Sequence, residues 1–392
     1  MSSKNFIRQN VRIYPNKSQI QFLNQDIGNQ RFVWNHFLSE NKKLYDSEKK
    51  FLFYPETSKL VIDLKKENEF LKIGNSQCLQ QTLRDFDGAL KAGYKQQKGF
   101  PKFKKKSSGG SIRLPQGCSI VDEKLKLPKI GFIKSRGTLP EQFNSVTILR
   151  KPSGKFYASF VVEFTLSEKV EIKSSVGIDL NSRHFVVLSN GSAIENPKFL
   201  KEKEIRLKRY QKSYSRKQKG SKNQNKARLK LAKQHEKIGN CQKDFLDQLT
   251  TNLVKTYDHL SIEDLNVKAM QQFNGRMIGM APFRAFRLKL TWKANKFGKH
   301  LKVINRFCPT SKVCSECGQE LKLTLKDRWI ACDCGNSIHR DYNAAKNIHR
   351  VGTTRINACE DRKPPTDFSS FRWLSLKQEA PSFRVGQFTD QM

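Results

Sequence analysis

Residues 174–305 constrain the fold most, because short apolar segments alternate there with long helical ones. SVGIDL and HFVVLSNG predict a β-hairpin, and a long basic region follows them. HLSIEDL, a helical stretch at 281–299 and HLKVINRF then come in turn. Strands that alternate with helices in this way are typical of an α/β domain built on a mixed sheet.

Two of these predicted strands end in acidic residues. Side chains alternate across a strand, so in SVGIDLNS Asp179 shares a face with Gly177, which should leave room there for a ligand. In HLSIEDLN the neighbours Glu263 and Asp264 must point to opposite faces, and alternation alone does not say which of them joins Asp179. In HRDYNAAKNI a helix would place Asp341 on a small apolar face that packs on the sheet, together with Ala344, Ala345 and Ile348.

Two acids at strand ends and one on a helix form the set that a metal-dependent phosphodiesterase needs. Carboxylate oxygens bind hard divalent cations. Two such ions, roughly 3.5–4 Å apart, can activate water and stabilise the leaving oxygen. Taken singly, each acid could equally be a solvated carboxylate or a helix cap, and Asp341 lies where any helix favours an acid. The combination indicates a nuclease site.

A cysteine-rich insert occupies 308–336. CSECG supplies Cys314 and Cys317 as C-x₂-C, and CDCG supplies Cys332 and Cys334 as C-x-C. Four thiolates in two pairs predict a structural tetrahedral zinc site with no open position for catalysis. Cys308 and His339 are close enough in sequence to replace one of the four. The single cysteines are expected in cores or loops: Cys78, Cys118, Cys241 and Cys359.

The charge of the chain indicates a polyanionic partner. The 74 Lys and Arg residues exceed the 36 Asp and Glu residues by 38. Nucleic acid is the partner that such an excess favours, with an anionic membrane or a ribosome as the alternative. No apolar run approaches the roughly 18 residues of a membrane span, and the N-terminus lacks the apolar stretch of a secretory signal. A cytoplasmic, nucleoid-associated protein is expected.

Two basic segments are candidates for contacts with nucleic acid. Residues 201–237 hold fifteen Lys and Arg against three Glu, and they predict two helices joined by a loop along phosphate backbones. GFPKFKKKSSGG, at 99–110, adds basic residues together with Phe100 and Phe103, which could stack on unpaired bases or pack in a core. The candidate contact residues are Lys102, Lys104, Lys208, Arg209, Arg216 and Lys217.

The order and spacing of several motifs resemble the TnpB proteins, RNA-guided nucleases encoded by insertion sequences and relatives of type V CRISPR effectors. The matching runs are RIYPNKSQIQFL, RFVWNHFL, LQQTLRDF, GFPKFKKK, KLKLPKIGFIK, GIDLNS, the basic 201–237 segment, SIEDLN, CPTSKVCSECG and HRDYNAAKNI. They extend over nearly the whole chain.

This resemblance implies a multidomain α/β protein. A RuvC-like nuclease domain of RNase H fold would cover 171–306 and 338–350, with a zinc-ribbon-like insert at 307–337. A helical recognition lobe would cover 13–105, and a wedge β-barrel 1–12 with 106–170. Residues 351–392 are expected to form a loose C-terminal tail.

The resemblance also implies roles for individual residues. It places the catalytic acids on Asp179, Glu263 and Asp341, which would hold two Mg²⁺, with Mn²⁺ as a substitute. It places zinc on Cys314, Cys317, Cys332 and Cys334, although C-x-C departs from the commoner C-x₂-C. Positions that read a short motif beside the target map to Tyr54, Gln77 and Gln80.

The implied function is an RNA-guided endonuclease that cuts double-stranded DNA next to that motif. A guide RNA from the element's own end would supply specificity by base pairing. One nuclease centre is visible, so it should cut both strands in turn. A catalytically silent RNA-guided DNA-binding repressor is the first alternative, but such chains should have lost an acid or the cysteines, and this one keeps both. A transposase acting on element ends is the second, because strand transfer uses similar metal sites.

Overall fold

The computed structural model describes residues 5–95, 99–181, 184–197, 199–266, 282–324 and 327–354. Of the predicted C-terminal tail, 351–392, the part from residue 355 onward lies outside the described residues. The chain divides into two compact units, an N-terminal unit of Phe6–Glu163 and a C-terminal unit that begins at Phe164. No helix of the described residues combines the length and the apolar character that crossing a bilayer requires.

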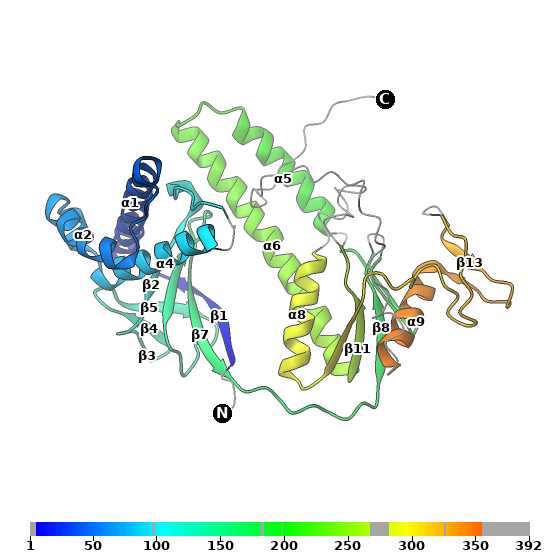
Figure 1. Cartoon of the computed structure of the whole chain (residues 1–392). Coiled ribbons are helices and arrows are strands. Elements are labelled where there is room, and N and C mark those ends of the chain that lie inside the picture. The colour runs from blue at the N-terminus through cyan, green and yellow to red at the C-terminus, as the bar shows by residue number, and fades with distance from the viewer. Residues whose placement is uncertain are drawn as a thin grey trace. The chain divides into compact units, whose positions relative to one another are not determined.

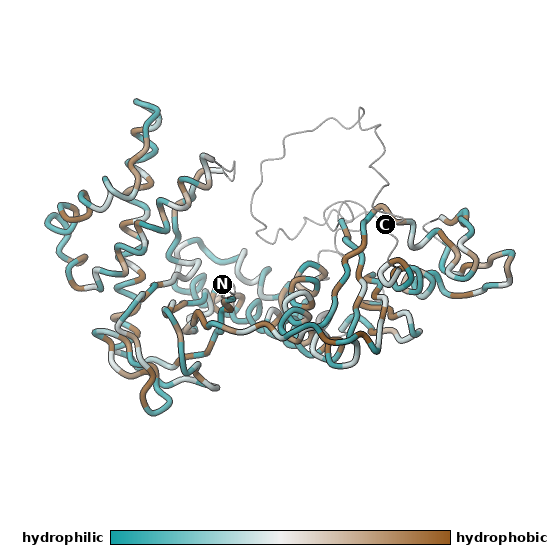
Figure 2. The backbone as a smooth tube through the Cα atoms, turned by 60° about the horizontal axis from the view of Figure 1, so that its bottom comes forward, coloured by the Kyte–Doolittle hydropathy of each residue, from teal (hydrophilic) through white to brown (hydrophobic). Residues whose placement is uncertain are grey.

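The N-terminal unit contains a seven-stranded sheet in the order β2-β6-β7-β1-β5-β4-β3. Alternation explains its core: in β4 the side chains of Leu125 and Leu127 are buried while Lys124 and Lys126 are exposed. Figure 2 shows hydrophobic and hydrophilic residues interleaved along the backbone of the chain. The strands are β1 (Asn5–Tyr14), β2 (Gly110–Leu114), β3 (Ser119–Val121), β4 (Lys124–Leu127), β5 (Gly131–Arg136), β6 (Val146–Arg150) and β7 (Phe156–Phe164).

Four helices of this unit pack around a second core. The first begins at a capping box, in which the Asn16 side chain accepts from Gln19 N at 2.9 Å and the Gln19 side chain accepts from Asn16 N at 2.9 Å. Their shared core contains Trp34, Phe37 and Phe86. The helices are α1 (Lys17–Glu48), α2 (Tyr54–Glu67), α3 (Phe70–Ile73) and α4 (Ser76–Lys95), and a 3₁₀ turn, η1 (Lys106–Ser108), precedes β2.

The C-terminal unit is built on a five-stranded mixed sheet in the order β10-β9-β8-β11-β12, as the strand and helix alternation predicts. Strands β8, β11 and β12 are parallel, while β9 is antiparallel to both of its neighbours. The strands are β8 (Ser175–Asp179), β9 (His184–Leu188), β10 (Ala193–Glu195), β11 (His259–Glu263) and β12 (His300–Ile304).

Helices cover both faces of this sheet (Figure 1). Val176 and Ile178 of β8 pack with apolar residues of α6 (Lys222–Thr256) and α8 (Phe283–Lys296) in one core. The opposite face carries α9 (Arg340–Thr353). α5 (Phe199–Ser215) packs against α6. α6 extends to Thr256, well beyond the end of the basic segment 201–237. A hairpin of β13 (Trp329–Ala331) and β14 (Ser337–His339) precedes α9.

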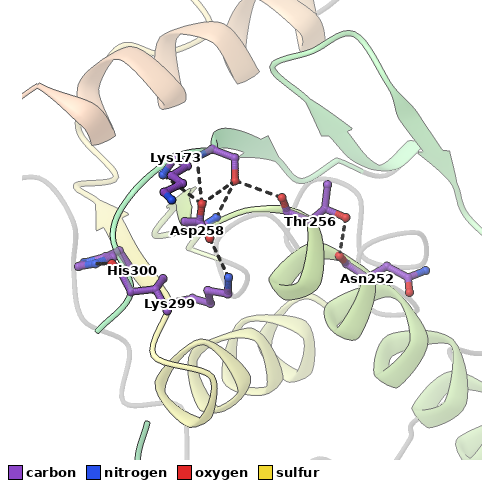
Figure 3. A network of polar contacts seen from close by, with 8 residues as sticks. Lys173, Asn252, Thr256, Asp258, Lys299 and His300 are labelled. Carbon is purple, nitrogen blue, oxygen red and sulfur yellow. Dashed lines mark hydrogen bonds and ion pairs between the residues drawn. The ribbon is translucent and has the colours of Figure 1, made fainter. Parts of the chain in front are cut away.

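A polar network centred on Asp258 aligns the beginnings of the three parallel strands (Figure 3). Its Oδ2 accepts from Lys173 N at 3.1 Å and from Ser174 N and Oγ at 3.0 Å each. Lys299 Nζ donates to Oδ1 at 2.7 Å. These hydrogen bonds hold the pKa of Asp258 well below its usual range, and the bond from Lys299 has the largest effect. Because His259 is paired with both Ser175 and His300, the strands start level and their carboxyl ends meet at the opposite edge.

Candidate active site and metal centre

The carboxyl ends of β8 and β11 bring two of the predicted acids together. Ile178 is paired with Ile262, so Asp179 and Glu263 occupy the next position on adjacent parallel strands. Parallel neighbours in register place their side chains on the same face. Asp179 and Glu263 therefore lie side by side on the face that α9 covers.

Asp264, the acid that alternation could not separate from Glu263, is engaged elsewhere. Its carboxylate forms ion pairs with Arg287 of α8 and with Arg306. Burial alone would raise its pKa, but the hydrogen bonds from both guanidinium groups lower it. Since α8 packs on the face opposite α9, the geometry joins Glu263 and not Asp264 to Asp179.

Helix α9 supplies Asp341 in its first turn, where the backbone N of Asp341 donates to His339 Nδ1 at 3.3 Å. Ala344, Ala345 and Ile348 are buried, so the expected face of this helix does pack on the sheet. A Cβ at Gly177 would lie 2.2 Å from the carbonyl oxygen of Ala345. The prediction that Gly177 leaves room for a ligand was therefore wrong, because the backbone of α9 fills that space.

Burial destabilises the charged forms of Asp179 and Glu263. Burial raises the pKa of Asp179 to about 7, and the charges of Asp341 and Glu263 contribute, against a 3.2 Å hydrogen bond from Asn181 and the charge of Arg340. Burial likewise raises the pKa of Glu263 to about 7, against a hydrogen bond from Thr310. Three hard oxygen donors with excess negative charge form a suitable site for divalent cations.

The structure also brings the four predicted cysteines of the insert together, with their sulfur atoms within 4.8 Å of one another. The Cys314 and Cys334 sulfurs are 3.7 Å apart, and those of Cys317 and Cys332 are 3.5 Å apart. Zn–S bonds of about 2.3 Å in a tetrahedron separate sulfurs by about 3.8 Å, so the cluster has the right size for zinc. Cys308 and His339 are not members of this group.

The cluster favours a thiolate at Cys314. Burial raises the pKa of this thiol, but the Asn336 amide, which donates to its Sγ at 3.2 Å, and the backbone N–H groups of Cys317 and Glu316 bring it down to about 6. The thiolate is the form that binds metal. These four cysteines could therefore hold a metal ion.

The predicted motif-reading residues lie along α4 and at the start of α2. Gln80 is exposed, and Gln77 lines a hollow of about 630 Å³ together with Lys129. The Tyr54 ring lies 5.3 Å from the guanidinium of Arg84, which follows Gln80 by one helical turn. Arg84 was not predicted as a site residue, although its four-residue spacing places it on the same helix face as Gln80.

The predicted phosphate contacts are distributed over both units. In the N-terminal unit, the Lys102 carbonyl accepts from Trp34 Nε1 at 3.2 Å, and Lys104 Nζ lies 3.6 Å from the Trp34 ring centre. Phe103 has an exposed fraction of 46%, and the Lys42 ammonium lies 4.8 Å from its ring centre. In the C-terminal unit, Lys208 is half-buried on α5 and Arg209, also on α5, is exposed. Arg216 and Lys217, which follow the end of α5, are exposed as well.

Comparisons with known proteins match most of the chain. Residues 159–274 match a family model described as "Probable transposase", residues 283–348 a "Cas12f1-like, TNB domain", and residues 7–50 a "Helix-turn-helix domain".

Two relatives are similar over most of their length. A Streptomyces pristinaespiralis protein named "Putative RNA-guided DNA endonuclease" is 34% identical over 96% of both chains. An Escherichia coli (strain K12) protein with the same description, InsQ, is 28% identical over 82% of this chain and 86% of its own.

Among solved structures, the chain is similar to a Cas12f1–sgRNA–target DNA complex determined by cryo-electron microscopy. The TM-score is 0.53 at 16% identity, and the match covers 85% of this chain and 83% of the other. At this identity the likeness shows a shared fold.

Proposed function

The chain belongs to the TnpB family, and from this we propose that it is a guide-RNA-directed endonuclease that cuts double-stranded DNA. One observation supports the cutting activity above all. Asp179, Glu263 and Asp341 come from β8, β11 and α9, three elements far apart in sequence, and the charges of Glu263 and Asp341 both act on the Asp179 carboxyl.

The side chains present suit two different metal sites. Asp179, Glu263 and Asp341 would hold two Mg²⁺ or Mn²⁺ ions, which supply a site for activating water and stabilising the leaving oxygen. The four cysteines would hold one Zn²⁺ that folds the insert. Asn181 and Thr310 hold the carboxylates of Asp179 and Glu263 by hydrogen bonds of 3.2 and 3.3 Å.

The basic residues would neutralise phosphates of the guide RNA and the target DNA. These contacts position the nucleic acid without reading its sequence. Pairing with a guide transcribed from the element's own end would select the target. Tyr54, Gln77 and Gln80, with Arg84 beside them, would read the short flanking motif.

A matched pair of neighbouring acids tests the proposal. The protein is purified with its RNA, the RNA is sequenced, and a plasmid that matches the guide is incubated with it in Mg²⁺. We expect Glu263→Gln to lose cutting while still binding DNA, and Asp264→Asn to keep cutting at temperatures where both variants remain folded.

Two outcomes would favour other functions. Binding without cutting by the unaltered protein in Mg²⁺ and Mn²⁺ would indicate a repressor. Strand-transfer products from element ends would indicate a transposase. Equal cutting by Glu263→Gln and the unaltered protein would show that the site is elsewhere.

A further inference from the structure

Three buried polar side chains connect the candidate active site to the cysteine insert. Thr310, Asn343 and Asn347 have exposed fractions of 5%, 0% and 2%. Buried polar groups of this kind are costly unless hydrogen bonds satisfy them. Each of the three forms a hydrogen bond with the loop after β12 or with Glu263.

Thr310 contacts the acid directly. Its Oγ1 donates to Glu263 Oε2 at 3.3 Å. Helix α9 holds the backbone of Thr310, because Asn347 Nδ2 on this helix donates to the Thr310 carbonyl at 2.8 Å. The hydroxyl group therefore reaches Glu263 from a fixed backbone.

Asn343, one helical turn before Asn347, fixes the next part of the loop. Its Oδ1 accepts from Ser315 N at 2.8 Å, and its Nδ2 donates to the Val313 carbonyl at 2.7 Å. Asn347 Nδ2 donates to that carbonyl as well, at 2.7 Å. Residues 313–315 include Cys314, so both ends of this loop segment are bound to one face of α9.

The same helix carries Asp341 in its first turn. One rigid element thus positions Asp341 through its own backbone and Glu263 through Asn347 and Thr310. A glutamate on a strand end has several rotatable bonds, and a hydroxyl donor restricts them. Outer partners that orient a metal ligand commonly change metal affinity by 10- to 100-fold when they are removed.

We propose that Thr310 is a positioning residue that orients Glu263 toward the divalent cations, and that Asn347 holds Thr310 in place for this task. This inference rests on the proposed function, because it takes Glu263 as a metal ligand. The loop CPTSKVC, residues 308–314, would then orient an acid of the active site in addition to supplying Cys314 to the cysteine cluster.

The test compares Thr310→Val with Thr310→Ser in the full chain bound to its RNA. Val keeps the shape of the side chain and loses the hydroxyl group, whereas Ser keeps the hydroxyl. The first readout is the Mg²⁺ concentration that gives half of the maximal rise in Tm, which needs no DNA or cutting. The second is the Mg²⁺ concentration that gives half-maximal plasmid cleavage.

For Thr310→Val we expect both concentrations to rise about tenfold, and for Thr310→Ser to stay within about twofold of the unaltered protein. Asn347→Ala should raise them as well. A Thr310→Val protein with a lower Tm but unchanged Mg²⁺ dependence would show that the residue is only structural and would overturn the proposal.

Glu263→Gln separates this inference from the proposed function. It should weaken the Mg²⁺-induced rise in Tm strongly. If Glu263→Gln responds to Mg²⁺ like the unaltered protein, the assignment of the active site fails. If Glu263→Gln loses the response and Thr310→Val keeps it, only the role of Thr310 fails.

Discussion

Asp179 should destabilise the fold of the protein whenever Mg²⁺ is absent and the pH is high. Its pKa rises from an ordinary value near 3.8 to about 7 because the folded chain buries it beside Asp341 and Glu263. An acid with a raised pKa contributes stability below its unfolded pKa, and that contribution is lost as the pH rises through the folded pKa. Asp179→Asn removes the charge at nearly constant size, so it should stabilise the Mg²⁺-free protein.

The size of the effect follows from the two pKa values. A difference of about three pH units, at 1.36 kcal/mol each, gives an upper limit of about 4 kcal/mol above pH 7. The side chain is only half-buried, and solvent screening reduces the figure, so we expect a gain of about 1 to 2 kcal/mol at pH 8. At pH 5.5 the gain should be about half as large.

Thermal unfolding in Mg²⁺-free buffer that leaves zinc in place measures this gain at both pH values. Asp258→Asn is the matched control at the opposite edge of the same sheet. Its pKa is lowered from 3.8, chiefly by Lys299, so neutralising it should lower Tm about equally at pH 5.5 and pH 8, since both lie above the ordinary pKa of an aspartate. A Tm for Asp179→Asn at or below that of the unaltered protein at pH 8 would refute the reasoning.

Three further changes test the sheet, the insert and the basic helices. Gly177→Ala places a Cβ against the backbone of α9 and should cost about 3 kcal/mol in denaturant unfolding; a loss below about 1 kcal/mol would contradict the packing. Cys317→Ser should lower bound zinc, measured by elemental analysis, from one ion per chain to none, and unchanged zinc content would exclude this ligand set. Arg216→Ala with Lys217→Ala should weaken binding to all DNA sequences alike and reduce the salt dependence of log Kd by about two, whereas loss of selectivity for one sequence would contradict a phosphate role.

The acids could be located from sequence because strand alternation and helical spacing are local rules. Alternation put Asp179 and Gly177 on one face, and helical spacing put Asp341 with Ala344 and Ala345. These rules could not say what lies above Gly177, since its neighbour in space, Ala345, comes 168 residues later in the chain. The room expected for a ligand is occupied by a helix for that reason.

The residues that contact the acids could not be predicted from the sequence either. Thr310 and Asn347 lie 47 and 84 residues after Glu263, and neither stands in a pattern that signals a contact with it. Arg287 and Arg306 assign Asp264 to the opposite side of the sheet, and only the tertiary fold brings them there. The cysteine pairs are different, because their spacing alone predicted the cluster that the fold assembles.

Plasmid cleavage by the RNA-bound protein, compared with Asp179→Ala, tests the central claim most directly. The plasmid carries a target that matches the co-purified guide, and the reaction contains Mg²⁺. The proposed function predicts linear product with the unaltered protein, none with Asp179→Ala, and equal binding of target DNA by both. Linear product from Asp179→Ala at an undiminished rate would contradict it.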